Sequence, residues 1–287
     1  MHTIKSKYSC IPYLLIFPAI ILIVVFKIYP IFTTLMESFT FKGDFSFETY
    51  QRVLADKSFW NSLQVTLKIN VVMIPFQIAL SLFLALLCNV QVKGITAFRT
   101  IYFLPFTISL SVATIIWSLM FSVNNGVLNS VLNFIGIDSQ RFLVDKNQAL
   151  WCIVIIASWK GCGYWMMFFL AGLKNIDTSI YESATVDGAG YFTTLFRITL
   201  PLIKRVMLFV LVANTTANVL LFVPMQMLTK GGPQGSTNVL MYEAYNSAFR
   251  YADRERSAVM IIALLFIIAI ISLAQFRLLQ AEDRKVK

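Results

Sequence analysis

The chain has 287 residues, of which 58% are hydrophobic and only 13% are charged, and its mean hydropathy is +0.73. A soluble domain typically carries about 25% charged residues, so a soluble or a disordered protein is excluded. Lipid must solvate much of the apolar surface. The formal net charge of +10 comes from scattered Lys and Arg residues without a nucleic-acid-binding motif, which excludes nucleic acid as a partner and is typical of the ends of membrane spans.

Six apolar runs are long enough to cross a bilayer. A spanning helix needs about 20 mostly apolar residues, and the runs that qualify are 13–35, 63–88, 101–121, 150–173, 206–228 and 258–279. The first run is too long for a cleaved signal peptide, which predicts an uncleaved helix. Prolines inside the runs predict kinks at Pro18, Pro30, Pro75, Pro105 and Pro224. We therefore predict an all-α membrane protein in which residues 1–287 form a single domain.

Six spans place both termini on the same side of the membrane. Basic residues favour the cytoplasmic side, and Lys and Arg near the span ends are slightly more numerous on the side of the termini. The sequence therefore predicts a multi-pass protein with both termini in the cytoplasm. The segment 174–205 then lies on the cytoplasmic side as well.

Residue types that commonly bind metals are few. The cysteines form no Cys-x-x-Cys pair, and the only histidine is His2. Cysteines in or beside apolar runs usually behave as small hydrophobic residues, which is the interpretation for Cys10, Cys88, Cys152 and Cys162. We therefore expect no disulfide, no metal site and no cofactor bound by this chain.

The connection 174–205 is long for a link between two helices and keeps apolar residues where a solvated loop would be polar. Ser179 followed by Glu182 predicts a capping box at the start of a helix. Apolar residues at helical spacing continue on both sides of Gly188 and Gly190, which predicts a helix–turn–helix. Two short helices with an apolar face suit docking on a partner protein; a simple solvated connection is the alternative.

This connection resembles the EAA motif of ABC importer permeases, which reads Glu-Ala-Ala, three residues, Gly, nine residues, Ile, one residue, Leu-Pro. The match begins with Glu182-Ser183-Ala184, continues at Gly188 and ends with Ile198-Thr199-Leu200-Pro201. One position departs from the motif, because Ser183 stands where the motif has its middle alanine. Asp187-Gly188-Ala189 inside the motif also resembles the family.

A second segment narrows the resemblance to the carbohydrate-uptake permeases. Leu228-Thr229-Lys230-Gly231-Gly232-Pro233, followed by Ser236-Thr237, is similar to their Thr-x-Gly-Gly-Pro segment. Trp159 and Ala171-Gly172-Leu173 resemble the same family, and the resemblance covers essentially the whole chain. It implies the six-helix transmembrane bundle of the type I, maltose-type importers, without the large outer insertion and extra N-terminal helices of the larger maltose-type subunit.

The resemblance implies a transport subunit rather than an enzyme. The chain contains no Gly-x-x-x-x-Gly-Lys-Ser/Thr phosphate loop, so ATP and Mg²⁺ would bind to partner ATPase subunits. The implied partners are a second homologous permease, two ATP-binding cassette ATPases, an extracytoplasmic solute-binding protein and the lipid bilayer. The implied location is the cell membrane of a bacterium or archaeon.

The resemblance also implies which residues couple the permease to its ATPase: Glu182, Ser183, Ala184, Asp187, Gly188, Ala189, Ile198, Leu200 and Pro201. Glu182 would pair with a basic group of the ATPase. Gly188 would permit a sharp turn where a side chain would crowd the two short helices. Pro201 would begin the helix of the fifth span, where proline is favoured.

Polar residues within the spans are candidates for the substrate path, because polar groups are costly there. Asn214 and Asn218 lie four residues apart and share a helix face, and their amides can donate to and accept from sugar hydroxyls. Hydrogen bonds between helices are the alternative. Lys160, next to Gly161, must face a cavity, pair or snorkel, and Phe106 could stack on a sugar ring.

The sequence leaves the cargo open. A carbohydrate is the first expectation, and glycerol-3-phosphate or another polyol or phosphorylated solute is the alternative for the same importer. An intramembrane enzyme would need paired catalytic groups at membrane depth, and none of the motifs of such enzymes occurs. A purely structural assembly protein would not need the EAA spacing.

Overall fold

The structure of the protein is a computed structural model that describes residues 11–90 and 92–283, with side chains described for 13–90 and 92–277. Within these ranges the regular secondary structure is helical apart from one short β-hairpin. It divides into two compact units: one contains the N-terminal segment as far as Asp56 together with Ala244–Ala263, and the other contains Lys57–Glu243 and the chain from Leu264 onward. The expectations for His2, Cys10 and the side of the membrane on which the termini lie fall outside the described residues.

The smaller unit begins with a long apolar helix. Its elements are α1 (Ile11–Ile23), a π-helical turn (Val24–Ile28), α2 (Tyr29–Ser38), the strands β1 (Thr40–Phe41) and β2 (Asp44–Phe45), and α3 (Glu48–Ala55). The strands pair antiparallel, with Thr40 opposite Phe45. The Glu255 carboxylate accepts hydrogen bonds from the backbone of the hairpin turn at Lys42 and Gly43, 3.2 and 3.3 Å long, and so holds the hairpin to the start of α14 (Arg254–Asp283).

The larger unit contains the remaining elements. They are α4 (Lys57–Cys88), α5 (Ile95–Thr107), α6 (Leu110–Met120), α7 (Val127–Phe134), a 3-10 turn (Phe142–Val144), α8 (Ala149–Lys174), α9 (Thr178–Val186), α10 (Tyr191–Thr194), a π-helical turn (Leu195–Thr199), α11 (Leu200–Leu202), α12 (Lys204–Val219) and a second π-helical turn (Met225–Thr229). Helices α13 (Leu240–Phe249) and α14 contribute residues to both units.

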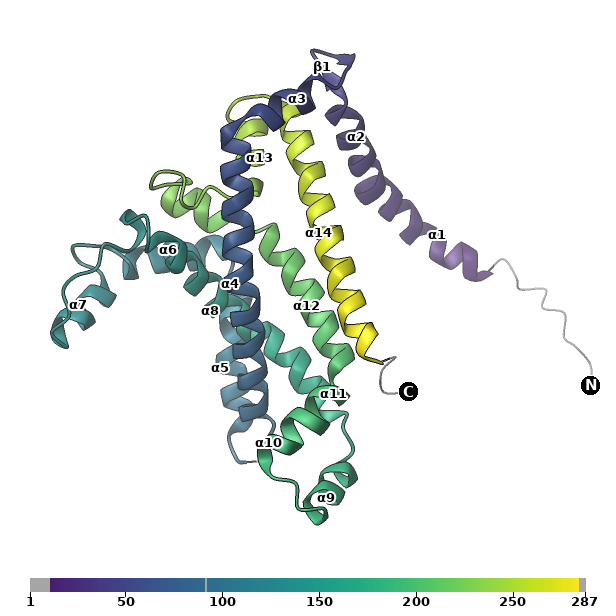
Figure 1. Ribbon diagram of the computed structural model, residues 1–287, viewed down its shortest axis with the longest axis vertical. Coiled ribbons are helices and arrows are strands. Elements are labelled where there is room, and N and C mark those ends of the chain that lie inside the picture. The colour runs from purple at the N-terminus through teal and green to yellow at the C-terminus, as the bar shows by residue number, and fades with distance from the viewer. Residues whose placement is uncertain (1–10, 91, 284–287) are drawn as a thin grey trace, which may run out of the picture. The chain divides into compact units, whose positions relative to one another are not determined.

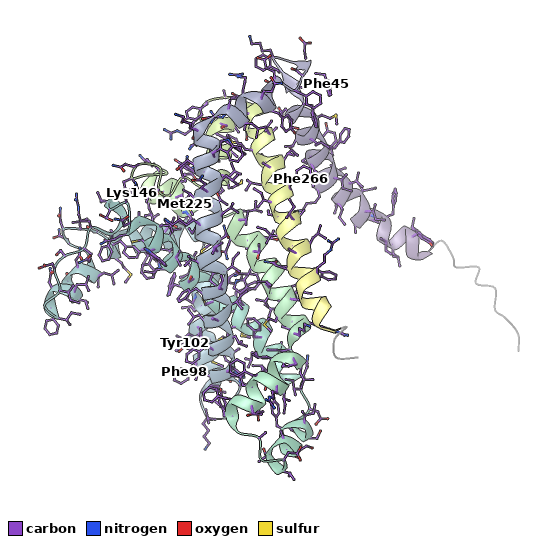
Figure 2. The ribbon with its side chains drawn as sticks, in the orientation of Figure 1. Phe45, Phe98, Tyr102, Lys146, Met225 and Phe266 are labelled. Carbon is purple, nitrogen blue, oxygen red and sulfur yellow. The ribbon has the colours of Figure 1, made fainter. Side chains whose placement is uncertain are left out.

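Helix α8 forms the centre of the larger unit. It packs against α4, α5 and α12, and Figure 1 shows α4, α5 and α8 side by side. Met166 and Phe169 of α8 are fully buried in this core together with Ala85 of α4. Other large apolar side chains remain exposed on the helices, as Figure 2 shows for Phe98 on α5 and Phe266 on α14. Such exposure suits a surface that meets lipid or another subunit.

Four of the described helical segments are long and apolar enough to cross a membrane: Tyr13–Ser38, Lys57–Cys88, Ala149–Lys174 and Arg254–Arg277. They correspond to the first, second, fourth and sixth predicted runs. The third predicted span, 101–121, needs correction, because it consists of α5 and α6 bent by 98°. Pro105 removes one backbone donor two residues before α5 ends, and the Ser109 hydroxyl caps the start of α6 by accepting from Val112 N.

The fifth predicted run, 206–228, also differs from the structure. Helix α12 begins at Lys204 and ends at Val219, so it is 16 residues long. The chain is non-helical at Leu221 and Phe222, and helical geometry resumes at Val223 and Pro224, directly before the π-helical turn at Met225–Thr229. Six membrane spans therefore remain a prediction, in which the third is a bent pair and the fifth is short.

Candidate functional site

The EAA segment begins with a capped helix whose cap differs from the prediction. The Asp177 carboxylate, rather than Ser179, caps α9 by accepting a hydrogen bond of 3.0 Å from the backbone N–H of Ser179. Ser179 is thus the second residue of the helix, and the predicted Ser179–Glu182 capping box is wrong. Hydrogen bonds from Ser179 hold the pKa of the Asp177 carboxyl below its usual value.

The end of α9 explains the glycine of the motif. Gly188 has a φ of 73°, and its N–H donates to Thr185 O (3.1 Å) while the N–H of Ala189 donates to Ala184 O (2.9 Å). This pair of hydrogen bonds is a Schellman motif, which favours glycine at the residue with positive φ. A side chain at Gly188 would meet nothing within 4 Å. The expected crowding is therefore wrong, and the constraint lies in the backbone.

The return from α9 to the membrane helices runs through α10, a π-helical turn and α11. Pro201 lies in the first turn of the short helix α11 and does not begin α12, which starts three residues after it, at Lys204. The hydroxyls of Tyr181 and Thr199 lie 3.3 Å apart and connect α9 to this return. Figure 1 shows α9, α10 and α11 together at the lower end of the larger unit. The predicted helix–turn–helix is therefore present.

The EAA segment presents an acidic and apolar surface. Glu182 is exposed, and no described residue pairs with its carboxylate. Large apolar side chains are exposed nearby: Val186 is 88% exposed, Phe192 71% and Phe196 62%. Only Ala184 of the Glu-Ser-Ala triplet is buried. A surface that exposes so many apolar side chains beside the acids Glu182 and Asp187 suits docking against another protein.

A cavity of ≈ 430 Å³ lies between the membrane helices of the larger unit. It brings together four residues predicted from the sequence: Phe106, Lys160, Gly161 and Asn218. Asn214, the fifth, is fully buried beside Asn218. The remaining lining residues are mainly apolar or aromatic, and they are Gln77, Leu110, Ala157, Tyr164, Trp165, Ala217 and Leu221.

An amide cluster forms one wall of this cavity. The Oε1 atom of Gln77 on α4 accepts from Nδ2 of Asn214 (2.6 Å) and from Nδ2 of Asn218 (2.9 Å), both on α12. Asn218 also donates to Asn214 Oδ1 at 3.0 Å. Gln77 Nε2 is buried and has no hydrogen-bond partner among the described residues. Hydrogen bonding between helices, one of the two sequence interpretations, is therefore present, and a donor remains in the cavity wall.

Lys160 holds the bend between α5 and α6. Its Nζ atom donates to the carbonyl oxygens of Phe106 (2.9 Å) and Ile108 (2.6 Å). Non-helical backbone at membrane depth requires such partners, because no water is available there. The ammonium group also lies 5.2 Å from the centre of the Phe106 ring, within the range of a cation–π interaction.

Aromatic rings form another part of the cavity lining. Phe106 stacks on Tyr164, with ring centres 4.1 Å apart and an interplanar angle of 15°, and Tyr164 contacts Trp165 edge to face. One face of Phe106 is thus covered by protein, which limits its predicted role as a platform for sugar. Sequence reasoning missed Gln77, Tyr164 and Trp165. Of the three, Gln77 is the one that the sequence could have indicated, because it is a polar residue within an apolar run.

The long apolar helices, the cavity between them and the exposed apolar side chains of the EAA segment suit a membrane transport component. Residues 77–287 match the family described as binding-protein-dependent transport system inner membrane component. The chain belongs to this family of ABC importer permeases. It is a multi-pass inner membrane protein and a non-catalytic transport component, and ATP is handled by ATPase partners.

Similar proteins are matched along nearly their full length. The lactose transport system permease protein LacF of Rhizobium radiobacter is 36% identical over 99% of this chain and 98% of its own length. The sn-glycerol-3-phosphate transport system permease protein UgpA of Salmonella choleraesuis is 30% identical over 96% and 95%. A chain of the bacterial alginate ABC transporter, crystallised with an alginate pentasaccharide-bound periplasmic protein, matches with a TM-score of 0.84 and 25% identity over 94% of this chain and 93% of that chain.

Proposed function

We propose that this permease translocates a carbohydrate that an extracytoplasmic solute-binding protein delivers. The observation that carries this proposal is the cavity among α4, α5, α6, α8 and α12, which joins amides to aromatic rings. Its volume of ≈ 430 Å³ falls within the range of about 300–1,000 Å³ that is typical of small-molecule sites. The names of the lactose permease and of the alginate transporter support a carbohydrate cargo.

The amide cluster supplies the chemistry that sugar hydroxyls require. An amide donates through nitrogen and accepts through oxygen, as a hydroxyl does. Asn218 and Gln77 both line the cavity, and Gln77 Nε2 is a donor whose hydrogen bond a cargo hydroxyl would complete. Asn214 is fully buried and would orient the other two amides. Trp165 and Tyr164 would meet the apolar face of a sugar ring, and Gly161 leaves room beside them.

We propose that α9 and the turn after it couple this permease to its ATPase. Glu182 offers an unpaired carboxylate to a basic group, and Ser183 and Asp187 are exposed beside it. Ala184, Gly188 and Ala189 build the Schellman motif that fixes the end of α9. Ile198, Leu200 and Pro201 form the return toward α12. The complete importer would contain a second homologous permease, two ATPases and the binding protein.

In this proposal residues 1–287 form one transmembrane domain with six spans and both termini in the cytoplasm. The EAA segment then faces the compartment that holds the ATPase. Glycerol-3-phosphate or another phosphorylated polyol is the second candidate cargo. The similarity to UgpA and the positive charge of Lys160 in the cavity wall favour it.

The test is transport by the complete importer in liposomes. Both permeases, the ATPases and the binding protein are reconstituted, and ATP-dependent uptake is measured for lactose, for galacturonate and for glycerol-3-phosphate. We expect uptake of a carbohydrate that requires the binding protein and is abolished by Glu182→Lys, with assembly in the membrane unchanged. Uptake without the binding protein, or wild-type uptake by Glu182→Lys, would contradict the proposal.

A further inference from the structure

Lys160 is the one charged residue among the described residues that line the transmembrane cavity. It lies in the middle of α8, which runs from Ala149 to Lys174, and its side chain is half-buried. A charge within a membrane helix is costly and is therefore normally paired, or faces a polar path. The position of Lys160 thus raises the question of which anion balances it.

The helices around the cavity provide no such anion. The sequences of α4, α5, α6, α8 and α12 contain neither Asp nor Glu. The acceptors of the Lys160 ammonium group are the two backbone carbonyls of Phe106 and Ile108, which are dipoles without net charge. An ammonium group has three N–H donors, so two carbonyls leave one donor over, and the positive charge meets only these dipoles and the Phe106 ring, whose centre lies 5.2 Å away.

A purely structural role at the bend does not require the charge. A neutral amide of similar length could donate to the same two carbonyls, and burying a charge without an anion costs more than burying an amide. Lys160 also does not snorkel to the membrane interface. Its ammonium group is instead held at the bend, 2.6 Å from Ile108 O. The charge therefore has a use beyond closure of the bend.

We propose that Lys160 binds an anionic group of the cargo, and that the cargo is a sugar or polyol bearing a carboxylate or a phosphate. This inference rests on the proposed function, and it narrows the substrate class of the same site. The anionic group would lie on the third donor of Lys160, and the hydroxyls would lie on Asn218 and Gln77, which line the same cavity. Charge would then select cargo inside the membrane, in addition to selection by the binding protein.

The first experiment compares neutral and anionic solutes of matched size. The complete transporter with its binding protein is placed in nanodiscs, and stimulation of ATP hydrolysis is measured with glucose, galactose and glycerol and with glucuronate, galacturonate and glycerol-3-phosphate. We expect the strong stimulators to be anionic. A neutral sugar that stimulates as well as any anion overturns the inference but leaves the proposed function standing. If no solute stimulates, both fail.

The second experiment separates a role in selection from a role at the bend. Lys160→Gln keeps donors for the carbonyls of Phe106 and Ile108 but removes the charge, and Lys160→Arg keeps the charge. We expect Lys160→Gln to lower the preference for an anionic over a neutral solute by about tenfold or more, the size of one charge-assisted hydrogen bond, and Lys160→Arg to restore most of it. Two results for Lys160→Gln would overturn the inference. One is an equal loss of stimulation for neutral and anionic solutes. The other is an unchanged preference, because an acid of the second permease then pairs with Lys160.

Discussion

Gly163 on α8 lies against Tyr102 on α5 so closely that a methyl group at Gly163 would overlap the Tyr102 carbonyl oxygen. The obstacle is backbone, which cannot rotate away as a side chain can. Small residues permit this kind of close approach between membrane helices. Gly161 lies two residues earlier. A methyl group added there would make only ordinary van der Waals contacts, the nearest with Trp165 Nε1 at 3.6 Å.

We therefore expect Gly163→Ala to separate α5 from α8 and to destabilise the protein by about 1–3 kcal/mol, the usual cost of overpacking. Gly161→Ala is the matched control and should cost little. The measurement is thermal unfolding of the purified transporter in detergent. Equal unfolding temperatures for the two variants would show that the close approach is unimportant.

The amide cluster gives a second prediction. Gln77→Leu removes the acceptor shared by Asn214 and Asn218 and leaves two buried donors poorly satisfied. Such losses cost about 1–3 kcal/mol, so the variant should unfold at a lower temperature and should transport cargo more slowly. Gln64→Leu serves as the control because Gln64 is exposed on the same helix. A Gln77→Leu protein with normal stability and uptake would argue against both roles of the cluster.

The Schellman motif gives a third prediction. Alanine at Gly188 must adopt a φ of about 73°, which costs about 1–2 kcal/mol for a residue with a Cβ. Gly188→Ala should therefore increase hydrogen exchange at the Ala189 amide and weaken co-purification of the ATPase. Gly190 has a φ of −72°, and a methyl group added there would meet no atom within 4 Å, so Gly190→Ala should behave like the wild type. Stronger effects at Gly190 than at Gly188 would be inconsistent with this explanation.

The cap of α9 gives a prediction for pH. The pKa of Asp177 is lowered in the folded protein by hydrogen bonds from Ser179, so the ionised carboxylate stabilises the fold. This stabilisation is complete when the pH is above about 3.8, the pKa of the carboxyl in the unfolded chain. It is lost as the pH falls through the lower pKa of the folded protein. NMR titration of the Asp177 carboxyl should give a midpoint below that of a short unstructured peptide. Asp177→Asn should keep the cap and Asp177→Ala should lose it, as seen by exchange at the Ser179 amide.

The sequence predicted local features well where one short segment determines them. The second run ends at Cys88 in the structure, as expected, and the helix–turn–helix around Gly188 follows from its spacing. The cap was assigned incorrectly because Asp177 and Ser179 are both good capping residues and lie two positions apart. Local sequence does not determine which of the two residues caps the helix. The path by which the chain enters the helix determines it.

The bend and the cavity depend on contacts between distant residues. The run 101–121 is apolar throughout, so hydropathy gives no sign of the 98° bend. Pro105 marks the region, but the partner that satisfies the carbonyls there is Lys160, more than fifty residues later in the chain. Gln77 and Asn214 are separated still further. A periodic pattern within one helix cannot indicate which polar residues of different helices meet.

The first helix of the smaller unit has a practical consequence. Every residue from 13 to 32 is exposed, and nearly all of them are apolar. Water cannot solvate such a cylinder without severe aggregation, so the polypeptide needs an amphiphile around it from synthesis to assay. Detergents that strip bound lipids should precipitate the isolated subunit, whereas a nanodisc or a short-chain polymer belt should keep it in suspension.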